Sequence, residues 1–216
     1  MLYSSAASAS ERVYDEVKES ILTNELAGGE LISEGDVASR CEVSRTPVRE
    51  AFLRLQAEGW MRLYPKRGAL VLPVTERDAR EVVDARKLLE GHAVRAAVAT
   101  DTSTARLVAR LQVNLEDHRL VAADDVAQFS RLDAEFHQLI VAAGGNELLA
   151  GFFTGLGERH RRMASTSVQR DPRVVARILA DHTELLHLIE ARNADGFDAA
   201  LQRHLDDVHD LPGCLQ

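Results

Sequence analysis

The chain has 216 residues with a formal net charge of −8, and 45% of the residues are apolar while 28% are charged. This composition supports a buried core and excludes an intrinsically disordered chain, and the acidic balance excludes a basic surface over the whole molecule. Two cysteines, no apolar run of membrane-spanning length and no signal peptide predict a cytoplasmic protein without a disulfide framework and without a membrane partner.

The chain begins with an Ala/Ser-rich segment, residues 1–9, which predicts a flexible tail. Ser8 and Glu11 have the spacing of a capping box, and the apolar periodicity that follows predicts a helix over about 11–27. Ser33 predicts the cap of a short second helix, which ends at a tight corner. These features predict two helices at the start of the folded chain.

A third helix and a β-hairpin follow the corner. Ser44 predicts the helix cap, Pro47 fits the first turn, and Gly59 ends the helix. Residues 60–73 place apolar side chains on both sides of the turn Pro65–Gly68, which predicts a hairpin with a basic tip. Three helices followed by such a hairpin form the layout of a winged helix-turn-helix.

The rest of the chain shows helical periodicity only. Turn-forming segments divide it into six predicted helices, at about 76–99, 103–121, 125–143, 146–166, 172–192 and 195–210. The sequence therefore predicts a mainly α chain of two domains. A winged helix-turn-helix over 10–74 precedes an antiparallel, all-α bundle of about six helices over 75–212.

The start of the third predicted helix carries short polar and cationic side chains, as a helix that enters the major groove of DNA requires. These side chains are Ser44, Arg45, Thr46 and Arg49. Two of them, Arg45 and Arg49, lie four residues apart on one face, and seven cations but only three anions lie between residues 40 and 67. The alternative is an ordinary solvated surface in which Arg54 is paired with Glu50.

The run Glu42–Trp60, EVSRTPVREAFLRLQAEGW, resembles the signature of the GntR family of bacterial transcription regulators. The segments LAGGELI before it and KRGALV after it are similar to the same family. Membership implies binding to a double-stranded DNA operator through the third helix and the hairpin. Together with the layout, the resemblance predicts DNA contacts from Arg40, Ser44, Arg45, Thr46, Arg49, Lys66, Arg67 and Gly68.

The helical part resembles the FCD-type ligand-binding domain of the FadR-like branch of this family. The run Asp84–Glu90, DARKLLE, is similar to the first helix of that domain, and six helices rather than seven resemble its VanR-type subgroup. The resemblance implies a small organic acid as effector. Arg86 is expected to hold its carboxylate through two parallel hydrogen bonds, and the alternative is a structural ion pair with Glu90.

Four polar side chains are expected to meet inside the bundle. Asp133 and His137 lie four residues apart in LDAEFH and therefore share one face of a helix. His182 and His204 lie on the last two helices, and antiparallel packing would bring them to the same level. Burying such groups without partners is costly, so a bound metal is one interpretation of this pattern. The alternative is a polar core network, or histidines at the surface.

The resemblance supports the metal, because these four positions match the Asp and three His ligands of metal-binding members of the branch. Imidazole and one carboxylate suit a divalent ion such as zinc, nickel, manganese or iron, and they suit calcium poorly. His187 and His209 each follow a predicted ligand by five residues. They lie about 140° further round their helices and are expected to miss the site.

These features together predict a homodimeric, ligand-responsive repressor that binds a palindromic operator and is controlled by a small carboxylic acid in a metal-containing pocket. One alternative is a metal-dependent enzyme with a nucleic-acid-binding appendage, because such a metal site keeps open coordination positions. The chain carries no nucleophile elbow, phosphate-binding loop or dinucleotide fingerprint, which favours the regulator. Another alternative is an architectural DNA-binding protein whose helical part only dimerises.

Overall fold

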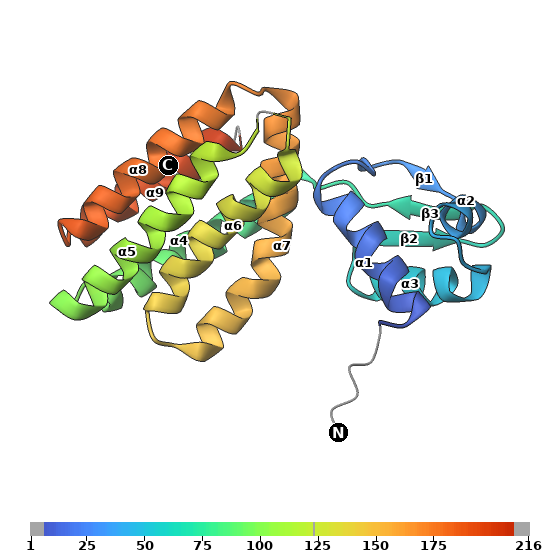
Figure 1. Cartoon of the computed structure of the whole chain (residues 1–216), viewed down its shortest axis with the longest axis horizontal. Helices are drawn as coiled ribbons and strands as arrows, with labels where there is room; N and C mark the ends of the chain where they lie inside the picture. The colour runs from blue at the N-terminus through green and yellow to red at the C-terminus, as the bar shows by residue number, and fades with distance from the viewer. Residues whose placement is uncertain (1–6, 123, 210–216) are drawn as a thin grey trace. The chain divides into compact units, whose positions relative to one another are not determined.

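The computed structural model describes residues 7–122 and 124–209. The chain forms two compact units, and the boundary between them along the sequence lies between Val74 and Thr75 (Figure 1). Most of the predicted tail, residues 1–9, lies outside the described residues, as does the predicted end of the second domain at 210–212. No helix in the described ranges is long and apolar enough to cross a membrane.

The first unit contains the predicted three helices and hairpin. Its elements are α1 (Ala9–Leu22), β1 (Leu31–Ile32), α2 (Glu34–Arg40), α3 (Arg45–Ala57), β2 (Met61–Tyr64) and β3 (Gly68–Val71). The capping box of Ser8 and Glu11 is present at the start of α1. Val17 of α1, Phe52 of α3 and Met61 of β2 belong to one buried core. The winged helix-turn-helix prediction is therefore confirmed.

One local prediction in this unit is wrong, and another is incomplete. Helix α1 ends at Leu22 rather than near residue 27, because Asn24 takes a positive φ of 59° and the Leu26 N–H donates to the carbonyl of Ser20. The hairpin also gains a third strand, since β1 pairs with β3 and gives an antiparallel sheet in the order β1-β3-β2. Strands β1 and β3 approach each other so closely that a Cβ added to Gly68 would overlap the Ile32 carbonyl.

The second unit is an all-helical bundle (Figure 1). Its helices are α4 (Glu76–Ala97), α5 (Asp101–Leu120), α6 (Val126–Ala143), α7 (Glu147–Arg170), α8 (Val174–Glu190) and α9 (Ala194–Val208). Thr75 caps α4 in a capping box with Asp78. The six predicted helices are confirmed, although α7 continues to Arg170, beyond its predicted end at residue 166. Apolar side chains from all six helices form the main core.

Candidate functional site

The N-terminal end of α3 presents three of the predicted DNA contacts to solvent. Arg45, Thr46 and Arg49 are exposed, while Val48 and Phe52 on the opposite face are buried in the core. The corner before α3 is tight because Glu42 adopts a left-handed conformation with φ 54°. The buried face therefore fixes the helix and leaves its cationic end free for a ligand.

The turn between β2 and β3 adds a second basic element beside α3. Arg45, Arg49, Lys66, Arg67 and Gly68 line one open hollow of the surface, between the start of α3 and the turn. Within the described ranges none of these four cations has an ion-pair partner. Unpaired, exposed cations on adjacent elements are typical of a surface that binds phosphate.

Three other side chains of this unit have contacts that bear on their predictions. Arg40 forms an ion pair with Glu16, at 3.0 Å between Nε and Oε1. Ser44 occupies the N-cap position of α3, but its side chain makes no capping hydrogen bond. Arg54 pairs with Glu58 four residues later, at 3.2 Å, rather than with Glu50. The ion pair ties Arg40 to α1, and its contact with DNA stays a prediction.

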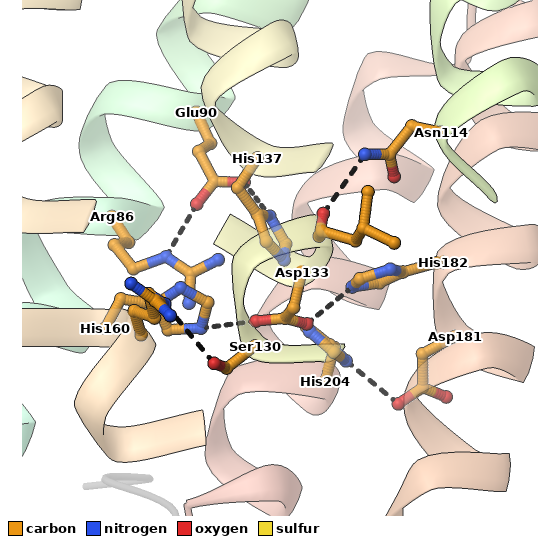
Figure 2. A network of polar contacts seen from close by, with 12 residues as sticks. Arg86, Glu90, Asn114, Ser130, Asp133, His137, His160, Asp181, His182 and His204 are labelled. Carbon is orange, nitrogen blue, oxygen red and sulfur yellow. Dashed lines mark hydrogen bonds and ion pairs between the residues drawn. The ribbon is translucent and has the colours of Figure 1, made fainter. Parts of the chain in front are cut away.

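The four residues expected to meet in the bundle do meet (Figure 2). Asp133 and His137 come from α6, His182 from α8 and His204 from α9. Each offers one ligand atom, these atoms all lie within 4.8 Å of one another, and all four residues are buried. A spacing of one helical turn on α6 and the packing of α8 against α9 produce this cluster.

Two of the imidazoles are oriented by carboxylates that contact the ring nitrogen not offered to the cluster. His137 Nδ1 lies 2.6 Å from Glu90 Oε2, and His204 Nδ1 lies 3.1 Å from Asp181 Oδ2 (Figure 2). A carboxylate accepts a hydrogen bond from the Nδ1–H of the ring that it contacts, so each ring keeps the lone pair of its Nε2. Such carboxylate–histidine pairs are the usual outer partners of metal-binding histidines.

Several inner atoms of the cluster lack hydrogen bonds, although His182 Nε2 lies 3.4 Å from Asp133 Oδ1. His137 Nε2 and both nitrogens of His182 are buried without a hydrogen bond among the described residues. Burial keeps the pKa of His137 and of His182 well below the ordinary value of 6.5, and it raises the pKa of Asp133 to about 7. Neutral imidazoles whose lone pairs accept no hydrogen bond, together with a buried carboxyl group, fit a divalent metal ion.

Arg86 lies fully buried on α4 beside this cluster (Figure 2). Its Nε donates to Glu90 Oε1 at 2.9 Å, so the predicted ion pair is present. The two terminal nitrogens, Nη1 and Nη2, have no partner within the described part of the chain. Glu90 thus contacts both Arg86 and His137, and the forked end of the guanidinium stays available for a carboxylate.

His160 on α7 is a member of the site that the sequence did not identify. Its Nε2 lies 3.2 Å from Asp133 Oδ2, and its side chain is buried. It sits in the run ERHRRM, which is typical of an exposed helix, so no local signal marks it. His187 is exposed, as predicted, whereas His209 packs against the His160 ring, with ring centroids 5.7 Å apart, and lies outside the four-residue cluster.

Comparison with known proteins assigns both units. Residues 9–71 match the family of bacterial regulatory proteins named gntR, and residues 81–207 match the FCD domain. Over 202 residues the chain is 27% identical to the HTH-type transcriptional repressor RspR of Escherichia coli, covering 92% of this chain and 86% of that protein. Over 215 residues it is 29% identical to the gluconate operon transcriptional repressor of Bacillus subtilis, covering 95% and 86%.

Solved structures share the fold. McbR/YncC of Escherichia coli superposes with a TM-score of 0.72 at 23% identity, covering 94% of this chain and 95% of that one. A GntR regulator from Rhodococcus sp. RHA1 gives a TM-score of 0.75 at 22% identity, covering 94% and 97%. Nothing in these comparisons supports the alternative of a metal-dependent enzyme. The chain belongs to the GntR family of bacterial transcriptional regulators, and its helical bundle is an FCD domain.

Proposed function

We propose that this regulator is a repressor that binds a palindromic operator as a dimer and responds to a small carboxylic acid held in a metal-containing site of the FCD domain. The observation that carries the proposal is a buried cluster of unpartnered ligand atoms beside an arginine whose fork is free. The names of the two relatives described above, both repressors, favour repression.

Asp133, His137, His182 and His204 would hold the ion, and the donor set suits zinc, nickel, manganese or iron. A bound ion would supply positive charge and open coordination positions to an oxygen ligand. The other parts of the site belong to the chain itself: Glu90 and Asp181 orient two of the imidazoles, and His160 contacts the outer oxygen of Asp133.

Arg86 would bind the effector carboxylate through Nη1 and Nη2, while Glu90 holds its Nε. Both side chains have no exposed surface, so an effector cannot reach them unless the helices around α4 separate. Helix α4 begins directly after the boundary between the units at Thr75. Effector binding would therefore favour a changed position of α4, the helix that follows the DNA-binding domain. This movement would couple the effector site to the DNA-binding surface.

A screen of small carboxylic acids by thermal shift tests this assignment. A ligand that binds only the folded protein raises its melting temperature. At least one acid should stabilise the metal-loaded protein and have no effect on Arg86→Lys, which keeps the charge beside Glu90 but loses the planar fork. If every stabilising acid raises the melting temperature of the wild type and of Arg86→Lys equally, the acids bind away from Arg86 and the assignment is wrong.

Substitution of both Arg45 and Arg49 should abolish specific binding to operator DNA. Arg45→Ala/Arg49→Ala should weaken operator affinity by about 2–6 kcal/mol, because each arginine that reads a base edge contributes about 1–3 kcal/mol. Fluorescence anisotropy with an operator selected from random DNA measures this. Arg106→Ala, which removes an exposed cation of α5, is the matched control and should bind like the wild type. Unchanged affinity of the double variant would exclude this docking.

Lys66→Ala should act differently from the arginine variants. Lys66 lies at the tip of the hairpin with no ion-pair partner in the described ranges, and a phosphate contact there carries no sequence information. Binding should weaken to specific and random DNA alike, and the slope of log K against log salt should become shallower by about one. Loss of affinity for the operator alone would instead place Lys66 at a base.

A further inference from the structure

Two exposed apolar side chains share the open hollow that the unpaired cations of α3 and the β2–β3 turn line. Leu53 of α3 is 50% exposed, and Tyr64, the last residue of β2, is 38% exposed. Single exposed apolar residues are ordinary, but two that line one cationic hollow indicate a ligand with both apolar and anionic parts. We define the α3–turn hollow by Arg45, Arg49, Leu53, Tyr64, Lys66 and Arg67.

The two walls of the hollow are fixed to each other. Strand β2 packs against α3 (Figure 1), and Gln56 Oε1 accepts a hydrogen bond at 2.8 Å from the N–H of Leu63, the residue before Tyr64. Phe52, the neighbour of Leu53 on α3, is fully buried in the core. Leu53 and Tyr64 therefore project from a firmly packed helix and strand, and the core of this unit is built from other side chains.

Charge in the hollow selects the kind of ligand. Among the described residues that line it, four are cations and a single one, Glu34, is an anion, so the formal charge is +3 in a chain of net charge −8. An apolar partner would desolvate these cations without pairing them, which is costly. A DNA strand alternates anionic phosphates with the apolar carbon surface of its sugars, and both parts find a complement here.

The helical rise decides which part of the DNA reaches Leu53. In the proposed docking, α3 enters the major groove by its N-terminal end, where Arg45 lies. A rise of about 1.5 Å per residue places Leu53 about 12 Å behind Arg45 along the helix axis. The major groove is only about 8.5 Å deep. Leu53 therefore lies at the rim of the groove, level with the sugar–phosphate strand, and not at the base edges.

We propose that the α3–turn hollow holds one sugar–phosphate strand of the DNA, with a deoxyribose packed between Leu53 and Tyr64. The proposal rests on the proposed docking, because a helix in the major groove and a turn beside it leave one strand between them. The Tyr64 hydroxyl, which makes no hydrogen bond among the described residues, would donate to a phosphate oxygen. Leu53 and Tyr64 would then contribute affinity for DNA of any sequence and fix the register of the arginines that read bases.

Anisotropy titrations of operator and random duplexes over a range of salt test the hollow with a matched pair of leucines. Leu53→Ala should weaken binding to both duplexes about fivefold, because the lost carbon atoms contact a sugar and not a base. The slope of log K against log salt should keep its wild-type value, since no charge is removed. Leu31→Ala makes the same change at a 53% exposed leucine of β1 outside the hollow, and it should bind like the wild type.

Two variants of Tyr64 separate the hydroxyl from the ring. Tyr64→Phe keeps the apolar surface and loses only the hydrogen bond to phosphate, so it should weaken binding to both duplexes about threefold. Tyr64→Ala also loses the ring and should weaken binding about tenfold or more. Thermal melts of the free variants check that a loss of affinity does not come from unfolding. Because both side chains are exposed, each variant should melt close to the wild type.

Two results would overturn the proposal, and each has a distinct meaning. If the loss in Leu53→Ala is confined to the operator and is absent when uracil replaces thymine, Leu53 contacts a thymine methyl group instead of a sugar. If Leu53→Ala and Tyr64→Ala both bind like the wild type, the strand passes elsewhere. Arg45→Ala/Arg49→Ala, measured in the same assay, then shows whether the docking of α3 still holds or fails as well.

Discussion

Protein loaded with a divalent metal should carry about one ion per chain, and a chelator should lower its melting temperature by on the order of 10 °C. The reason is that Asp133, His137 and His182 have buried atoms without hydrogen bonds, which an ion would satisfy in the folded state only. His182→Ala should be depleted of metal and insensitive to the chelator. Elemental analysis and thermal melts measure both quantities.

His187→Ala is the matched control, since His187 lies on the same helix, α8, and is exposed. This variant should keep its metal and its response to the chelator. Acidification should also release the ion, because protons compete with it for the imidazoles and for Asp133. If a well-folded wild type takes up none of zinc, nickel, manganese or iron and ignores the chelator, the cluster is a polar core network.

The second large effect is expected at Arg86. Arg86→Ala should lower the free energy of unfolding by about 3–5 kcal/mol, because it leaves the Glu90 carboxylate buried without its cation. Burial raises the pKa of Glu90 while the charge of Arg86 lowers it, so removal of Arg86 should also favour the protonated carboxyl. Urea denaturation of the chelated protein measures the loss.

The double variant Arg86→Met/Glu90→Gln separates charge from packing. It removes both buried charges at similar volume, so it should recover much of the stability that Arg86→Ala loses, without recovering a response to carboxylic acids. An Arg86→Ala protein as stable as the wild type and still responsive to acid would show that Arg86 neither pairs structurally nor holds the effector.

Elements with local signals could be predicted from the sequence, and elements that depend on distant contacts could not. The capping box of Ser8 and Glu11 could be predicted and begins α1, because the cap and its partner are three residues apart. Strand β1 has only two residues and exists because β3, nearly forty residues later, pairs with it. The end of α1 was misjudged for a similar reason: Leu26 continues the apolar spacing but is buried in a turn.

In the candidate site too, residues with a local sequence signal could be predicted and residues that depend on helix packing could not. Helical spacing brings Asp133 and His137 together, and the order of helices brings His182 and His204 to them. His160 joins only because α7 packs along α6, which no spacing within α7 indicates. The two functions of Glu90, toward Arg86 and toward His137, likewise depend on the packing of α4 against α6.

Control of DNA binding by a carboxylic acid at the metal and Arg86 is the core of the proposed function. It is tested most directly by titrating operator DNA with the metal-loaded wild type, with and without the acid found by thermal shift, and repeating the titration after chelation. The acid should change the dissociation constant for the operator by at least tenfold in the metal-loaded protein, within the usual 1–3 kcal/mol range of such couplings. After chelation the acid should cause no change. An equal change in the metal-loaded and the chelated protein would contradict it.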